Sequence, residues 1–148
     1  MNHPMTDSDL VTDLLRRDDF TREHLITVQC IRFTGNVHIG WFLALIVLHY
    51  TYARIGENDL KEVAGKYWVG KTRQAWTEDS RLSVYRFRKA IKTLQDHGLV
   101  EVTVLKLAFG KQIYVRMDQT LIDKILLDAA KLLALWESEE YINGKRYQ

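Results

Sequence analysis

The most regular spacing of apolar positions lies in the second half of the chain, between residues 84 and 97. At about 100° per residue, one helical face collects Phe87, Ala90, Ile91 and Leu94. Ser83 is a favoured N-cap residue, and Leu82 and Phe87 have the spacing of a hydrophobic staple. Gly98 stands where a left-handed residue closes many helices, with Leu99 placed to fold back on Leu94. The pattern predicts a helix over 84–97.

The period then changes from helical to alternating. Residues 99–106 and 112–117 alternate apolar and polar side chains, and the short connection between them contains Gly110. This combination predicts an antiparallel hairpin. Phe109 beside the turn is expected to pack under the hairpin or to touch a partner. Thr120 is then expected to cap a long helix that continues to about residue 141, with Asp123 in its first turn.

The first half of the chain is predicted to be mostly helical. Residues 6–19 are interpreted as a short amphipathic helix, and residues 25–33 fit either a strand or a buried helix. Residues 37–54 are apolar almost all round, which predicts a helix at the centre of the core that stops near Gly56. The apolar run within it covers ten residues, about half of the ~20 that a membrane span needs.

The segment between these halves is punctuated by small elements. Residues 58–65 are interpreted as a short helix capped by Asn58, and residues 67–69 as a short strand closed by Gly70. Thr72 is expected to cap a helix over 73–79 with Trp76 as its apolar anchor. From residue 58 to residue 117 the predicted order of helices and hairpin is therefore helix, short helix, helix and two-stranded hairpin, which is typical of a winged helix-turn-helix.

Several motifs within this order point to a family. They are Lys71-Thr72-Arg73-Gln74-Ala75-Trp76, Leu82-Ser83, Phe87-Arg88-Lys89-Ala90-Ile91, Leu94, His97-Gly98-Leu99-Val100-Glu101 and, more loosely, Phe33-Thr34-Gly35-Asn36. Over about 60 of the 148 residues the chain resembles the winged-helix domain of phage- and plasmid-type replication-module proteins. The resemblance implies a winged helix-turn-helix core (58–119). With the helices predicted on either side of it, we expect an α+β fold in one globular unit, with an N-terminal helical extension (1–57) and a long C-terminal helix (120–148).

Charge is distributed unevenly along the chain. Between Lys61 and Arg116 there are twelve basic and five acidic side chains, a net charge of +7, whereas the remainder has nine basic and fourteen acidic, a net charge of −5. Arg86, Arg88 and Lys89 stand near the start of the predicted helix, where cations oppose the helix dipole. This placement favours an anionic partner over a merely solvated face.

Duplex DNA is the partner that the resemblance implies, with the helix over 84–97 in the major groove and the hairpin beside it. The residues expected to contact DNA are Lys71, Thr72, Arg73, Arg81, Ser83, Tyr85, Arg86, Arg88, Lys89, Lys92, Lys106 and Lys111. The chain is then a non-enzymatic initiator or repressor of a mobile element. The alternative is a protein-binding module on a winged-helix scaffold, such as a small phage-encoded inhibitor of a host complex.

Signatures of enzymes and cofactors are missing from the sequence. The five histidines and one cysteine show no metal-ligand spacing, and the glycines form no phosphate-binding loop. We therefore expect no enzyme activity, no cofactor and no metal. Cys30, among apolar neighbours, is expected to be an inert buried thiol. With one cysteine and no apolar leader at the start of the chain, the expected location is cytoplasmic, without a membrane partner.

The last predicted helix is richer in leucine than one buried face requires. Its apolar positions are Leu121, Ile122, Ile125, Leu126, Leu127, Ala129, Leu132, Leu133, Leu135 and Trp136. Two interpretations stay open: a central helix wedged between the hairpin and the helix over 37–54, or the seam of a homodimer through residues 121–136. A dimer of this kind would space two recognition helices about one turn of DNA apart.

Overall fold

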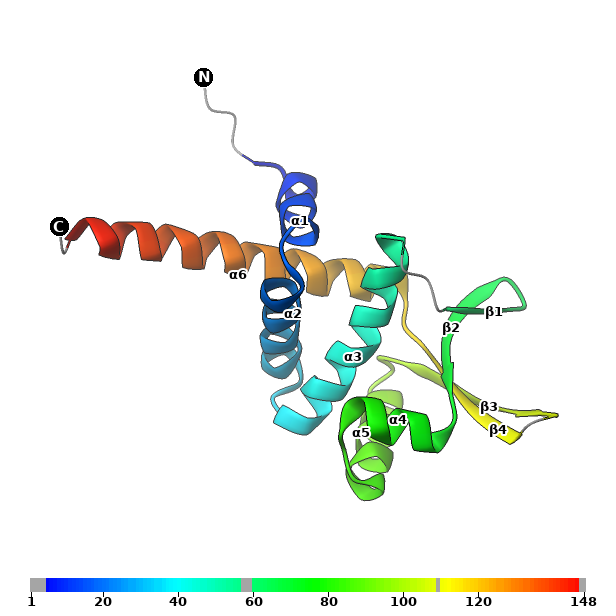
Figure 1. The fold of residues 1–148 in the computed structure, drawn as a ribbon. Helices are drawn as coiled ribbons and strands as arrows, with labels where there is room; N and C mark the ends of the chain where they lie inside the picture. Colours follow the sequence, from blue (N-terminus) through cyan, green and yellow to red (C-terminus); the bar gives the residue numbers. More distant parts are fainter. Residues whose placement is uncertain (1–4, 57–59, 109, 147–148) are drawn as a thin grey trace.

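The computed structural model describes residues 5–56, 60–108 and 110–146, the segment 139–146 as helix backbone only. In these residues it shows six helices and four strands (Figure 1). The helices are α1 (Asp7–Leu15), α2 (Asp19–Thr34), α3 (Val37–Arg54), α4 (Arg73–Ser80), α5 (Val84–Asp96) and α6 (Gln119–Arg146). The strands are β1 (Lys61–Val63), β2 (Lys66–Lys71), β3 (Glu101–Leu107) and β4 (Gly110–Arg116). All neighbouring strands are antiparallel in the order β1-β2-β4-β3, and the predicted α+β class is confirmed.

Helix α3 joins the two ends of the molecule. Figure 1 shows α1 and α2 lying against α6 on one side, and α4, α5 and the sheet on the other. Phe42, Leu43, Ile46 and Val47 of α3 are fully buried, which confirms the prediction that this helix lies in the core. Every helix contributes to one continuous apolar cluster, together with β2 and β4. No helix in the described ranges is long and apolar enough to span a bilayer.

Residues 25–33 belong to α2, so the buried-helix alternative holds for this segment. Its packing on α3 explains why. A Cβ atom built on Gly40 of α3 would lie 2.4 Å from the Cα of Ile31, so the two backbones meet where α3 has no side chain. Such an approach lets α2 and α3 bury their apolar faces against each other over most of their length.

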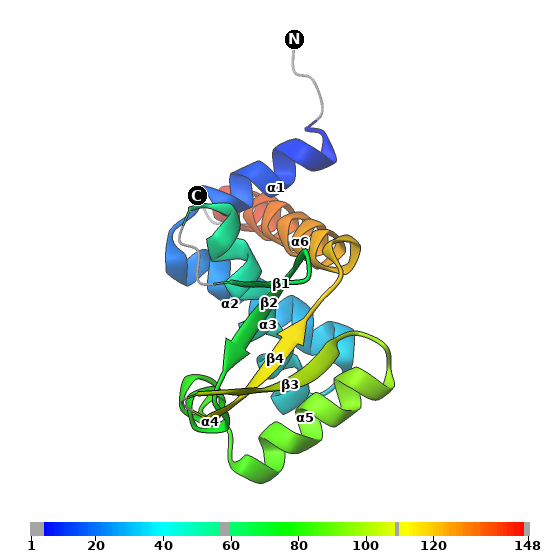
Figure 2. The same cartoon turned by 90° about the vertical axis from the view of Figure 1, so that its right-hand side faces the viewer.

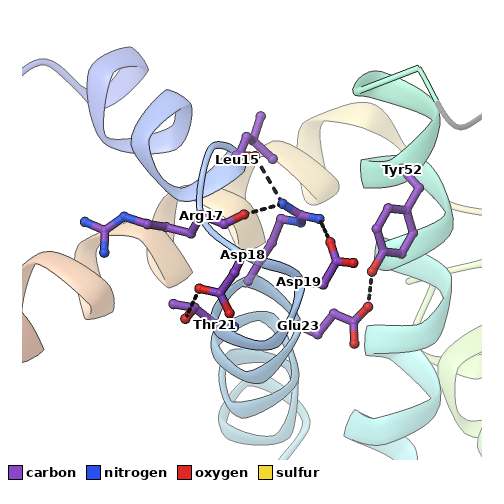
Figure 3. Close-up of polar contacts among 8 residues, drawn as sticks. Leu15, Arg17, Asp18, Asp19, Thr21, Glu23 and Tyr52 are labelled. Atoms are coloured by element: carbon purple, nitrogen blue, oxygen red, sulfur yellow. Dashed lines mark hydrogen bonds and ion pairs between the residues drawn. The ribbon is translucent and has the colours of Figure 1, made fainter.

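The helix predicted over residues 6–19 is confirmed as α1, but it ends at Leu15, where the chain breaks before α2. Arg22 is only 4% exposed. Its guanidinium donates hydrogen bonds to the carbonyls of Leu15 and Arg17, at 3.2 and 2.8 Å, and also pairs with the carboxylate of Asp19 (Figure 3). The carboxylate of Asp18 caps α2, accepting from the backbone N–H of Thr21 at 3.2 Å. Arg22 thus satisfies carbonyls that the end of α1 leaves without helical partners.

The prediction of a short helix over 58–65 is wrong, although Asn58 itself lies outside the described residues. Strands β1 and β2 form a hairpin there, and the predicted strand over 67–69 is part of β2. Ala64 and Gly65 connect them with φ of 52° and 78°, and two positive φ angles are typical of a type I′ hairpin turn. All three residues of β1 are exposed, so no buried face of this strand leaves a periodic signal in the sequence.

The helix and hairpin predicted from residue 84 onward are confirmed. Ser83 caps α5, and the two residues of the proposed staple, Leu82 and Phe87, are both buried. At the other end Gly98 has φ of 70°, its N–H donates to the carbonyl of Gln95, and the Leu99 N–H donates to the carbonyl of Leu94 at 2.9 Å. This is the hydrogen-bond pattern of a Schellman motif. Strands β3 and β4 follow as an antiparallel pair.

Helix α6 differs from its prediction at both ends. It begins at Gln119, and the N–H of Ile122 donates to the carbonyl of Asp118, so Thr120 lies inside the first turn and is not the cap. The helix continues to Arg146 instead of ending near residue 141. Its main neighbours are α1 and α2, with Arg17 of the α1–α2 connection paired to Glu137 at 2.6 Å. The expectation that it is wedged between the hairpin and α3 is therefore wrong.

Candidate nucleic-acid interface

An aromatic cluster fixes the orientation of α5. The rings of Phe42, Trp76 and Phe87 come from α3, α4 and α5, with centroids 5.5 to 6.3 Å apart, and all three are buried. The indole N–H of Trp76 also donates to the carbonyl of Ile113 in β4 at 2.9 Å. Because Phe87 points into this cluster, the opposite side of α5 faces solvent. Figure 2 shows α5 at the edge of the molecule, beside the sheet.

The solvent side of α5 carries cations that have no acidic partner. Arg86, Arg88 and Lys89 are exposed, and none of them forms an ion pair with the described residues. Tyr85 lies among them with 73% of its surface exposed. Lys92, one turn further on, differs because it pairs with Asp96 at 3.3 Å. The unpaired charge therefore lies in the first half of the helix.

Three of the predicted DNA contacts have roles inside the fold. The hydroxyl of Thr72 accepts from the N–H of Ala75, and the hydroxyl of Ser83 accepts from the N–H of Arg86 at 3.2 Å, so both cap helices. The ammonium of Lys71 pairs with Asp79 and lies 5.3 Å from the ring centre of Trp76, with only 14% of its side chain exposed. Lys71 lines a cleft together with residues of α2 and α3, such as Thr27 and Trp41.

A groove of about 630 Å³ separates α5 from the β3–β4 hairpin. Arg73, Arg88 and Lys111, from three different elements, stand on its rim. Its floor is apolar and consists of Phe87, Ile91, Val102, Val104 and Ile113. Val104 is 54% exposed, which is unusual for a valine that alternates with polar residues.

The hairpin adds a close pair of like charges. Lys106 of β3 and Lys111 of β4 are directly opposed in the register, so their side chains leave the sheet on the same face. Like charges in that arrangement destabilise a hairpin unless an anion lies between them. Phe109 at the turn lies outside the described residues.

No pattern in the sequence indicates that the start of α3 lies beside α5. A hollow of about 230 Å³ is lined by Asn36, His38 and Ile39 together with Tyr85, Arg86 and Lys89. Asn36, His38 and Ile39 are 46 or more positions before the residues they meet, and no local pattern links them. Arg81, in the turn between α4 and α5, is exposed with a left-handed φ of 58°. We call the surface formed by Arg73, Arg86, Arg88, Lys89, Lys106 and Lys111 the basic face.

The described residues contain neither a metal-binding cluster nor a reactive thiol. They contain no group of three or more histidine, cysteine or carboxylate side chains that could hold a metal ion. Burial raises the pKa of the Cys30 thiol to about 12, so it is protonated at neutral pH and a poor nucleophile. Burial also raises the pKa of Tyr50, whose hydroxyl donates to the carbonyl of Tyr67 and accepts from the N–H of Met117.

Comparison with known proteins gives no match to a protein-family model, a curated protein or a solved structure.

Proposed function

We propose that the protein binds duplex DNA without catalysing a reaction, as an initiator or regulator in the replication module of a phage- or plasmid-like element. One observation carries the proposal: Arg86, Arg88 and Lys89 crowd the first half of α5, face solvent and lack acidic partners. Arg86 lies in the first turn, where a cation costs about 0.3–1 kcal/mol at low salt. Helix stability alone favours acidic residues in the first turn. A bound anion would explain why basic residues stand there, because it would pair with their charges.

The order of elements supports a winged helix-turn-helix, but the segment that serves as its first helix differs from the one predicted from the sequence. In our assignment α3 takes the place of the first helix, which the sequence analysis put at residues 58–65. Strand β2 follows, then α4, then α5 as recognition helix, and β3–β4 as the wing, with β4 between β2 and β3. In this arrangement α5 would enter the major groove of the DNA, and Lys106 and Lys111 of the wing would contact the adjacent phosphate backbone.

The salt dependence of binding tests this proposal. The equilibrium constant for a generic duplex should fall linearly on a double-logarithmic plot as NaCl rises from ~50 to ~200 mM. About five phosphate contacts predict a slope of roughly −4 to −5, because each released counterion contributes about −0.9. A gel shift or fluorescence anisotropy titration gives the slope directly. No affinity at ~50 mM NaCl, or affinity that does not respond to salt, would contradict the proposal.

A second candidate function is the docking of an acidic protein segment, as in an inhibitor of a host complex. The apolar floor of the α5–hairpin groove favours this function. The exposed side chain of Val104 offers nothing to a phosphate group, but it can pack against the apolar side of an amphipathic protein segment. Under this alternative the duplex fails to bind at ~50 mM NaCl. The protein would instead capture a partner protein from a host lysate through this groove, and the Val104→Ala variant would capture less of it.

We also propose a homodimer, through a smaller surface than the sequence predicted. Most apolar side chains of residues 121–136 are already buried or half-buried within one copy, with Ile122, Leu126 and Leu133 among the buried ones. Leu135 and Trp136 stay 57% and 52% exposed. They border a hollow of about 220 Å³ that His24, Leu25 and Val28 of α2 also line, with Leu132. A patch that contains both a protruding indole and a hollow is able to pair with itself across a two-fold axis.

Sedimentation equilibrium should therefore give a mass near twice 17.4 kDa at high micromolar concentration. The double change Leu135→Ser/Trp136→Ser should return the protein to 17.4 kDa, because it removes the exposed apolar side chains and leaves the monomer core intact. Leu121→Ser is not a suitable control because Leu121 packs on the core. Lys131→Ser, an exposed change on the same helix, is the matched control. A wild-type monomer throughout would remove the dimer from the proposal.

A further inference from the structure

A second cleft lies on the other side of α4, away from the basic face. It has a volume of about 360 Å³, within the range of pockets that hold small organic ligands. One stripe of α3 forms its floor, with Trp41, Leu45, Leu48 and Tyr52 at helical spacing. Helix α2 forms one wall with Glu23 and Thr27. Trp41 is 44% exposed although it belongs to the most apolar helix of the protein.

The two ends of the cleft differ in how their charges are matched. At the α4 end, Lys71 and Asp79 neutralise each other. At the α2 end, the carboxylate of Glu23 accepts a hydrogen bond from the hydroxyl of Tyr52, which is a neutral donor (Figure 3). A carboxylate has about four acceptor sites, so it can take a further donor without losing Tyr52. The cleft thus combines an aromatic floor with one carboxylate that lacks a charged partner among the described residues.

We propose that this cleft binds a small aromatic amine. The ring would lie on Trp41 and the leucines, and the ammonium group would meet the carboxylate of Glu23. The ring of Tyr52 does not serve as a further cation site, because the guanidinium of Arg22 already lies 5.5 Å from its centre. An aromatic anion is disfavoured because it would face Glu23 or have to break the Lys71–Asp79 pair. The binding is independent of the proposed DNA-binding function.

One hydrogen bond connects the cleft to the turn before α5. The indole N–H of Trp41 donates to the carbonyl of Ser80 at 2.7 Å, and Ser80 is the last residue of α4. Arg81, with its left-handed φ, and the cap residue Ser83 follow directly. A ligand stacked on Trp41 would contact a side chain that is hydrogen-bonded to this turn, so the cleft is suited to regulating the basic face.

Three probes of similar shape test the proposal on the full chain by ¹⁵N–¹H NMR. They are 2-phenylethylammonium, the neutral isostere 2-phenylethanol and the anion phenylacetate. We expect the indole N–H peak of Trp41, identified by its loss in Trp41→Phe, to shift with the amine, along with the amides of residues 80–83. The amine should bind about five-fold more tightly than the alcohol, the size of one partly exposed ion pair, and the anion most weakly.

Glu23→Gln provides the matched variant, because glutamine keeps an acceptor for Tyr52 and removes the charge. In this variant the amine and the alcohol should bind equally, with the affinity of the alcohol unchanged. The wild-type order of the three probes stands as a test even if the variant does not fold. The proposal is overturned if none of the probes shifts the Trp41 peak at ~20 mM, if the alcohol or the anion matches the amine, or if a folded Glu23→Gln retains the preference.

Discussion

Phe87→Ala should lower the free energy of unfolding by about 3–5 kcal/mol, the usual cost of removing a buried phenylalanine side chain. Phe87 is 2% exposed, and its ring centroid lies 5.6 Å from that of Phe42 and 6.3 Å from that of Trp76. The neighbours come from α3 and α4, two other elements of the core, so the vacated space cannot close by moving α5 alone. Urea denaturation followed by circular dichroism measures the loss.

The matched control for this change is Tyr85→Ala. It removes an aromatic ring from the same helix at a position that is 73% exposed, and should alter stability by no more than about 0.5 kcal/mol. A typical domain is stable by only 5–15 kcal/mol, so Phe87→Ala alone leaves little reserve. A loss below 1 kcal/mol would show that α5 does not rest on the aromatic cluster.

Arg88→Ala/Lys89→Ala should weaken duplex binding at least 30-fold at low salt and leave folding unchanged. Each phosphate contact that is lost lowers the salt slope by ~1, and a lost base contact of arginine costs about 1–3 kcal/mol. Both side chains are exposed and unpaired, so the urea midpoint should stay within error of the wild type. Anisotropy titrations at several NaCl concentrations measure affinity and slope together.

A control for net charge is needed because the double change removes two positive charges. Arg32→Ala/Lys131→Ala removes the same number from exposed positions on α2 and α6, outside the basic face. It should reduce affinity no more than a few-fold, through the general field of the protein. Equal losses in the two double variants would mean that binding follows net charge and that α5 is not a recognition helix.

Local chemistry accounts for the elements that were predicted correctly. The caps at Thr72 and Ser83 and the Schellman motif around Gly98 involve atoms within a few residues of one another. Such contacts can be recognised from spacing because the same short segment contains both partners. The basic character of α5 was also readable, since Phe87 and Leu94 fix which face is buried and leave Arg86, Arg88 and Lys89 on the other side.

The errors lie where distant contacts override local preference. The break after Leu15 depends on Arg22, a charged residue that the sequence gives no reason to place in the interior. The β1–β2 hairpin has an exposed first strand, held by pairing with β2 instead of by a buried face. Lys71 is as basic as Arg73 in the sequence, yet only the fold brings Asp79 and Trp76 to it.

The sequence by itself determined that this protein is α+β, that α3 lies in the core, and that α5 is a capped helix with an apolar side and a basic side. Those features follow from periodicity and from contacts between near neighbours. Only the tertiary structure decided which cations share the basic face, where an exposed apolar groove and the Trp41 cleft lie, and that α6 covers α1 and α2. These are relations between segments tens of residues apart, and side-chain packing in three dimensions sets them.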